Sequence, residues 1–100
     1  AYICHCDMAA YHLIMGLSKQ GYRIPRDVSV LSFDNTELSR STRPLLSSVN
    51  LEKAAFAKTA LRQILWRSKH PDAEPQRILL NSTLVERESI APPEKGINKK

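Results

Sequence analysis

A single carboxylate, Asp34, stands where a strand-like run ends and a polar loop begins, in the stretch "SFDN". A carboxylate at such a junction can accept charge-assisted hydrogen bonds from the hydroxyl or N–H groups of a small ligand. It can equally act as a turn residue whose side chain bonds to the local backbone. The spacing of the residues alone leaves both interpretations open.

Cys4, His5, Cys6 and His12 lie close together near the start of the chain, and they include residue types that bind metal ions. On a strand, however, Cys4 and Cys6 point to one side and His5 points to the other. The sequence offers no second ligand cluster, and a disulfide across one residue has poor geometry. We therefore expect no metal, no cofactor, and two free thiols that suit a reducing cytosol.

A βαβ unit is predicted for the first third of the chain. Residues 2–6 and 28–33 read as strands, and residues 8–20 between them have helical spacing. This order predicts two parallel, neighbouring strands. Because ligands of such sheets bind beyond the carboxyl ends of the strands, we expect the Cys6–Asp7 and Phe33–Asn35 junctions to lie side by side.

The predicted helix has clear ends and two apolar stripes. Asp7 reads as its N-cap and Gly21 as the residue that stops it. A helix that is apolar on two sides is buried on two sides or covers a partner. One stripe is Ala10, Leu13, Ile14 and Leu17, and the other is Met8, Tyr11, Met15 and Ser18.

The remainder of the chain alternates loops with short regular segments. We expect a loop over 35–46 with a helical turn near 36–40, an extended piece over 46–49, a helix over 51–68 capped by Asn50, a strand over 76–80 and an extended piece over 84–89. The Pro-rich and Lys-rich end, residues 92–100, reads as a disordered tail.

The composition is that of an ordinary soluble domain, with 42% hydrophobic and 25% charged residues among 100. No apolar run approaches the roughly 20 residues of a membrane span. The net charge of +5 is scattered over helices and tail, which favours a solvated surface over a nucleic-acid patch. The abrupt start at Ala1 suggests that the true N-terminus is missing.

Three stretches together resemble the lac-repressor/galactose-repressor family of transcriptional regulators. They are "CHCDMAAYHLIMGLSKQGY", "IPRDVSVLSFDNTELSRSTRPLLSSV" and "PQRILLNSTLVERESIAPP". The family pattern has an Asn-Asp that opens a helix, a Gly-Tyr-x-Ile-Pro-x-Asp-Val-Ser-Val lead, a Gly-Phe-Asp, a Thr-Thr-Val crossover and an Arg-Glu-Ser ending. Most of these steps occur here in order, between about Tyr2 and Pro93.

The resemblance implies an α/β fold: a parallel-sheet, three-layer, periplasmic-binding-protein-like (type I) effector domain of two lobes, of which this chain supplies the C-terminal portion only. Residues 1–46 would belong to the C-terminal lobe. Residues 47–83 would cross to the N-terminal lobe and add a helix and a strand, and residues 84–91 would return.

The resemblance also implies effector-binding residues. Asp34 falls on the family's effector-contacting aspartate, although "SFDN" replaces the usual "GFDD". Cys6 stands where many members carry Asn, and Leu51 where many carry Gln, so two hydrogen-bonding amides are lost. Phe33 could line the pocket or belong to the core. For Asp7 the N-cap role alone is favoured.

By the same resemblance, the helix after the first strand contributes to a homodimer interface. The expected contact residues are Met8, Tyr11, Met15 and Ser18, with a second intramolecular core layer as the alternative. Leu38 and the loop after Asp34 are expected beside this stripe. Arg87 matches the terminal Arg of the family and is expected to be structural.

The function implied is the effector-binding and dimerisation region of a cytoplasmic bacterial repressor that senses a sugar or nucleoside. Operator DNA would be bound only through a helix-turn-helix domain absent from this chain, and no membrane is expected as a partner. The alternatives are a periplasmic sugar-binding receptor of a transport system and an inert remnant that folds only in part. An enzyme is not expected, because the sequence lacks a nucleophile–base pair, a Gly-rich phosphate loop and a metal cluster.

Overall fold

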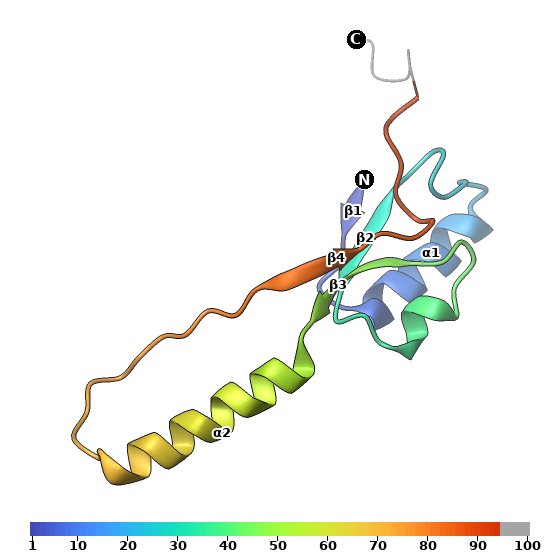
Figure 1. Cartoon of the computed structure of the whole chain (residues 1–100). Coiled ribbons are helices and arrows are strands. Elements are labelled where there is room, and N and C mark those ends of the chain that lie inside the picture. The colour runs from blue at the N-terminus through green and yellow to red at the C-terminus, as the bar shows by residue number, and fades with distance from the viewer. Residues whose placement is uncertain (95–100) are drawn as a thin grey trace.

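The computed structural model describes residues 1–94 and shows a body, residues 1–51 and 82–94, from which an arm, residues 52–81, projects (Figure 1). The elements are β1 Tyr2–Ile3, α1 Asp7–Lys19, β2 Val30–Phe33, the 3-10 helix η1 Glu37–Arg40, β3 Ser47–Leu51, α2 Lys53–Lys69 and β4 Ser82–Val85. Among the described helices, none is long and apolar enough to cross a membrane. Residues 95–100 of the expected tail lie outside the described part.

The predicted βαβ unit is confirmed. Strands β1 and β2 are parallel neighbours, with Ile3 beside Leu31, and α1 connects them. Both strands are shorter than predicted, although Cys4 still donates its backbone N–H to the Leu31 carbonyl at 2.8 Å. The predicted helical turn after β2 is also present, as η1.

The end of α1 is built as its sequence predicts. Gly21 has φ +89°, a left-handed conformation that glycine adopts without steric cost. The Gly21 N–H bonds to the Ser18 carbonyl and the Tyr22 N–H to the Leu17 carbonyl, each at 3.0 Å. These two bonds satisfy carbonyls that would otherwise lack partners at the helix C-terminus.

The core of the body is small and rich in serine. Its fully buried hydrophobic residues are Ala10, Ile14, Val30 and Leu46, and α1 packs them against one face of the sheet. Five serines are completely buried beside them: Ser32, Ser39, Ser47, Ser48 and Ser89. Hydrogen bonds between segments therefore supply part of the stability that apolar packing supplies in a larger core.

The sheet has the order β1-β2-β3-β4, with β4 antiparallel to β3. The returning chain is fastened by Ser89, whose hydroxyl donates to the Val30 carbonyl at 2.5 Å and accepts from the Ser47 N–H at 2.8 Å. The Ser89 carbonyl also accepts from the Val30 N–H at 2.9 Å. These bonds hold the segment that follows β4 against the two central strands, β2 and β3.

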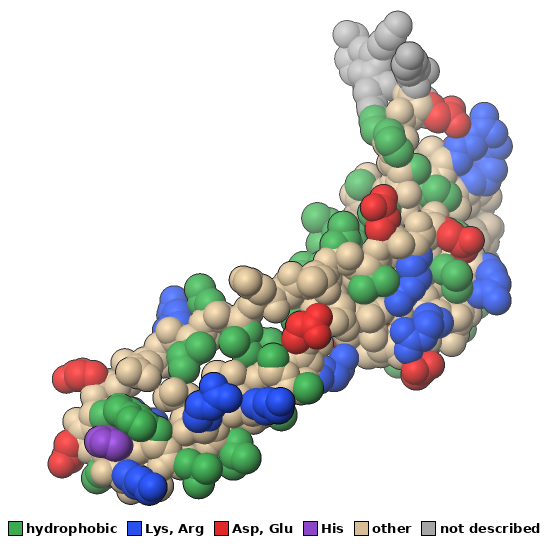
Figure 2. Space-filling view, viewed as in Figure 1, with side chains coloured by type: hydrophobic (Ala, Val, Ile, Leu, Met, Phe, Trp, Pro, Cys, Tyr) green, Lys and Arg blue, Asp and Glu red, His purple; other side chains and the backbone are tan. Residues whose placement is uncertain are grey.

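The arm contains α2 and the extended return, residues 70–81 (Figure 1). No residue of α2 is buried, and Leu61 and Ile64 are 58% and 65% exposed. Figure 2 shows hydrophobic side chains at the surface along the arm. The radius of gyration of 18.7 Å exceeds the roughly 13 Å of a compact domain of this length.

Two predictions for the arm are wrong. The strand expected over 76–80 is not formed, because no other strand within residues 1–94 lies beside it to pair. Asn50 does not cap α2, because it belongs to β3 and pairs with Thr83. The helix begins two residues later than expected, after Glu52.

The face of the sheet opposite α1 is open. Because side chains alternate along a strand, Ile3 and Phe33 point away from α1, and they are 71% and 37% exposed. On the edge strand β4, Leu84 is 52% exposed. The described residues thus form two of the three layers of the expected fold.

Candidate functional site

The carboxyl ends of β1 and β2 meet at one edge of the sheet, as predicted. A hollow of about 440 Å³ at this edge is lined by Cys6, Asp7, Met8, Asp34, Thr36, Glu37 and Leu38. The structure therefore brings Cys6 and Asp34 together. Phe33 and Leu51 lie at the same edge, at the last positions of β2 and β3, but they do not line this hollow.

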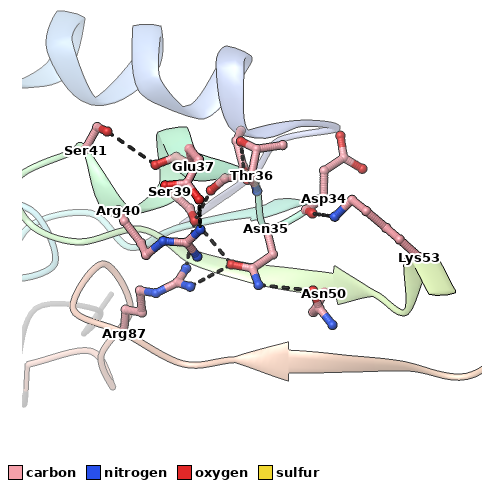
Figure 3. A network of polar contacts seen from close by, with 11 residues as sticks. Asp34, Asn35, Thr36, Glu37, Ser39, Arg40, Ser41, Asn50, Lys53 and Arg87 are labelled. Carbon is pink, nitrogen blue, oxygen red and sulfur yellow. Dashed lines mark hydrogen bonds and ion pairs between the residues drawn. The ribbon is translucent and has the colours of Figure 1, made fainter.

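Asp34 presents a half-buried carboxylate at this edge. Its backbone is fixed, because its N–H donates to the Val49 carbonyl at 2.9 Å and its carbonyl accepts from Lys53 Nζ at 3.1 Å (Figure 3). Within residues 1–94 its carboxylate makes no hydrogen bond or ion pair, so the turn bond of the alternative interpretation is not formed. The side chain is free to accept hydrogen bonds from a ligand.

The loop at Asp34 has an unusual backbone. Asp34 has φ +102° and Asn35 has φ +50°, and these are the only non-glycine residues with positive φ among those described. L-residues seldom adopt such values, and they persist where surrounding contacts hold them. Asp34 therefore leaves the strand in a direction that a regular extended chain would not take.

Asp7 is a buried hydrogen-bonding centre and not the N-cap that the sequence predicts. It is 1% exposed, while Cys6 occupies the N-cap position without a side-chain bond. Asp7 Oδ1 accepts from the hydroxyls of Ser32 at 2.5 Å and Ser48 at 2.7 Å. Asp7 Oδ2 accepts from the N–H of Thr36 at 2.6 Å and from its hydroxyl at 2.8 Å. Asp7 thus joins α1 to β2, β3 and the loop that follows Asp34.

These contacts decide the charge of Asp7. Burial raises the pKa of its carboxyl, but hydrogen bonds from Ser32, Ser48 and Thr36 outweigh burial, and the net pKa lies below the ordinary value. Asp7 is therefore ionised at neutral pH although it is buried. All four acceptor positions of its carboxylate are already occupied. Asp7 therefore holds the lining of the hollow in place and has no acceptor position left for a ligand.

The predicted dimer residues share one face of α1 but line two different hollows. Tyr11, Met15 and Ser18 line a second hollow of about 340 Å³, together with Ile14 and residues 41–43. Met8 lines the first hollow. Met8 and Met15 are 56% and 45% exposed, so α1 leaves this stripe uncovered within the described chain.

The two cysteines are not joined by a disulfide, and they have different surroundings. Cys4 packs against the core cluster, and Cys6 lies at the first hollow with its sulfur 3.4 Å from His5 Nε2. Both are free thiols, and burial and the neighbouring Cys6 raise the pKa of Cys4. Within the described residues, no group of three or more His, Cys, Asp or Glu side chains is arranged to hold a metal ion.

Sequence reasoning missed three polar residues that support the site, namely Ser32, Ser48 and Asn35, and it gave Asp7 only an N-cap role. Arg87 was expected to be structural, and it bonds to Ser39, Asn35, Leu46 and Ser47. Ser32 and Ser48 are fully buried, and Ser32 is the one polar residue of β2. A serine at a core-facing strand position needs a buried partner. That pattern was the available signal for a buried acceptor such as Asp7.

Comparison with known proteins assigns the chain to a family. The model of the periplasmic binding protein-like domain family matches residues 1–90. The ribose operon repressor of Haemophilus influenzae is 37% identical over 90 residues, which are 90% of this chain and 27% of that protein. The transcriptional repressor PurR of Mannheimia succiniciproducens is 36% identical with the same coverage of both chains.

A solved structure agrees with these relatives. A LacI family regulator from Enterococcus faecalis, solved with bound ribose, superposes with a TM-score of 0.76 and 28% identity. The match covers 89% of this chain and 33% of that one. The present chain spans only 27% of the length of the two curated repressors. It belongs to the periplasmic binding protein-like domain family, and its relatives there are transcriptional repressors of the LacI type.

Proposed function

We propose that this chain is the effector-binding and dimerisation region of a cytoplasmic bacterial transcriptional repressor that senses a sugar-like small molecule. The observation that carries the proposal is the Asp34 carboxylate, unpaired within residues 1–94 and facing a hollow that it shares with Cys6. A carboxylate with free acceptor positions suits adjacent ligand hydroxyls. The relatives named above include a ribose operon repressor and a regulator with bound ribose, which supports a pentose or a nucleoside as the effector.

Phe33 and Leu51 would complete the site with apolar surface. Both stand at strand ends beside Asp34, and both retain exposed area. Together with Cys6 they offer fewer hydrogen bonds than amide side chains would. The effector would then be held by Asp34 at its hydroxyl groups and by apolar contact at the face of its ring.

The roles of the other segments are inferred from the family. Residues 1–46 and 84–91 would form part of one lobe, and residues 47–83 would contribute to a second lobe that closes over the effector. Tyr11, Met15 and Ser18 would contact a second copy of the chain, with Met8 at the border of the effector site. Operator DNA would be bound by a helix-turn-helix domain outside this chain, and no catalytic activity is expected.

The test is titration calorimetry of the intact protein with D-ribose, D-glucose and adenosine, repeated with Asp34→Ala. We expect one of these ligands to bind and the variant to lose at least about a hundredfold in affinity, because a charge-assisted pair of hydrogen bonds is removed. Asp72→Ala is the matched control, because Asp72 is an exposed carboxylate in the turn after α2. Equal affinities for Asp34→Ala and the wild type would remove Asp34 from the effector site.

A further inference from the structure

The side chain of Asn35 joins three separate segments of the body (Figure 3). Its Oδ1 accepts from Arg87 Nη2 at 2.6 Å and from the Ser39 hydroxyl at 3.2 Å. Its Nδ2 donates to Asn50 Oδ1 at 3.1 Å. Its backbone N–H donates to the Ser48 hydroxyl at 2.9 Å. Both the oxygen and the nitrogen of the Asn35 amide therefore make hydrogen bonds.

The partners of Asn35 lie on the two connections of the arm, defined here as the outgoing strand β3 and the returning segment 82–87. Asn50 lies in β3, one residue before the chain leaves the body. Arg87 lies two residues after β4, at the end of the β3–β4 ladder opposite the arm. Arg87 is itself held, because its Nη1 donates to the Leu46 carbonyl at 2.7 Å and its backbone N–H donates to the Ser47 hydroxyl at 2.8 Å.

Asn35 also directly follows Asp34, and the two share the positive-φ backbone. A backbone held in a sparsely populated region depends on contacts that fix its neighbours. The bonds from Asn35 to Asn50 and Arg87 are such contacts. A movement of the Asp34 backbone must accordingly displace Asn35 and strain its bonds to both connections.

We propose that Asn35 is a positioning residue that ties the Asp34 site to both connections of the arm. The inference rests on the proposed function, in which Asp34 binds the effector. A ligand that binds to Asp34 and shifts its backbone then displaces β3 and the segment after β4 together. That displacement changes the direction in which the arm leaves the body. Asn35 contacts no ligand in this scheme and acts only through its neighbours.

The positioning role of Asn35 can be tested with two substitutions, because its amide oxygen accepts from Arg87 and its amide nitrogen donates to Asn50. Aspartate accepts hydrogen bonds but cannot donate them at neutral pH, so Asn35→Asp keeps the bond from Arg87 and loses the bond to Asn50. Asn35→Ala loses both. A role that depended only on the bulk of the side chain would not distinguish the two connections in this way.

The experiment is amide hydrogen exchange on the intact protein without ligand. In Asn35→Ala we expect exchange to accelerate about tenfold at Asp34 and Asn35, around Asn50 and at Arg87. In Asn35→Asp the acceleration should persist around Asn50, while Arg87 returns to the wild-type rate. Asn81→Ala is the control, because Asn81 is an exposed amide on the returning arm and should leave all four sites unchanged. Wild-type exchange at Asn50 and Arg87 in Asn35→Ala would overturn the proposal, as would identical profiles for the two Asn35 variants.

Adding D-ribose at saturating concentration separates this inference from the proposed function. In the wild type, ribose should slow exchange at Asp34 and at Arg87, and in Asn35→Ala only the effect at Asp34 should remain. Slowing at Arg87 that survives in Asn35→Ala would refute the coupling. Absence of any ribose effect in the wild type would refute ribose as the effector, while the ligand-free comparison still decides the role of Asn35.

Discussion

Replacing Asp7 should destabilise the body more than any other single change on the carboxyl edge. Asp7→Ala removes four hydrogen bonds and leaves the hydroxyls of Ser32, Ser48 and Thr36 and the N–H of Thr36 without this acceptor. Bonds to a charged group contribute about 1.5–3 kcal/mol each, but they are not additive. We expect the free energy of unfolding to fall by about 3–5 kcal/mol, a large share of the roughly 5–15 kcal/mol typical of a domain.

Asp7→Asn should cost less, about 1–2 kcal/mol, because the shape is kept and one oxygen still accepts from Thr36. The amide nitrogen would face the two serine hydroxyls, which can rotate to accept from it. The measurement is urea denaturation of the wild type and both variants, followed by circular dichroism. Asp27→Ala is the control, because Asp27 is an exposed carboxylate whose ion-pair partner within residues 1–94 is Arg23, and such pairs contribute little.

The pH dependence gives an independent check. The pKa of Asp7 is lowered in the folded state, so its stabilising contribution is present above the unfolded pKa of about 4 and is lost as pH falls through the folded pKa. The stability difference between the wild type and Asp7→Asn should thus shrink in acid. A value for Asp7→Ala within about 0.5 kcal/mol of the wild type, or a difference that does not depend on pH, would refute the assigned role.

Three further predictions concern the rest of the body. Met15→Glu places a charge on the exposed stripe of α1 and should convert a dimer of the intact protein into monomers, as measured by sedimentation velocity. An unchanged dimer would show that this stripe is not the dimer interface. Gly21→Ala should destabilise the protein by about 1 kcal/mol because of the positive φ, whereas Gly16→Ala inside α1 should stabilise it by about 0.5–1 kcal/mol, and thermal unfolding compares the two. Cys4 should react with iodoacetamide only at higher pH than an unfolded thiol, because its pKa is raised; this is measured in Cys6→Ser, and a rate equal to that of the unfolded thiol would contradict it.

The sequence predicted those features that local pattern determines. The apolar run before Phe33, the stripe of α1 and Gly21 specify a βαβ unit, and the meeting of Cys6 with Asp34 follows from parallel strands. The role of Asp7 was missed because an acidic residue at a helix start has an ordinary local explanation. Its true partners, Ser32 and Ser48, come from strands 25 and 41 residues away.

The failures in the arm have a different cause. A strand such as 76–80 is stabilised by a neighbour, and a sequence shows the propensity of a segment but not whether a partner exists. Asn35 was overlooked because its contacts, Asn50 and Arg87, are distant in sequence and meet only when the sheet is assembled. Contacts of this kind cannot be inferred from spacing along one chain.

The pairing of β3 with β4 makes the body separable by protein engineering. Leu51 and Ser82 are paired residues of an antiparallel ladder, so they stand where a two-residue hairpin turn would connect them. Replacing residues 52–81 with Asn-Gly would close the ladder as a β-hairpin and keep Asp7, Asp34, Asn35 and Arg87 in one minimal domain. The same replacement would remove half of the large hydrophobic residues that are exposed within residues 1–94, namely Phe56, Leu61, Ile64, Leu65, Trp66, Ile78 and Leu79.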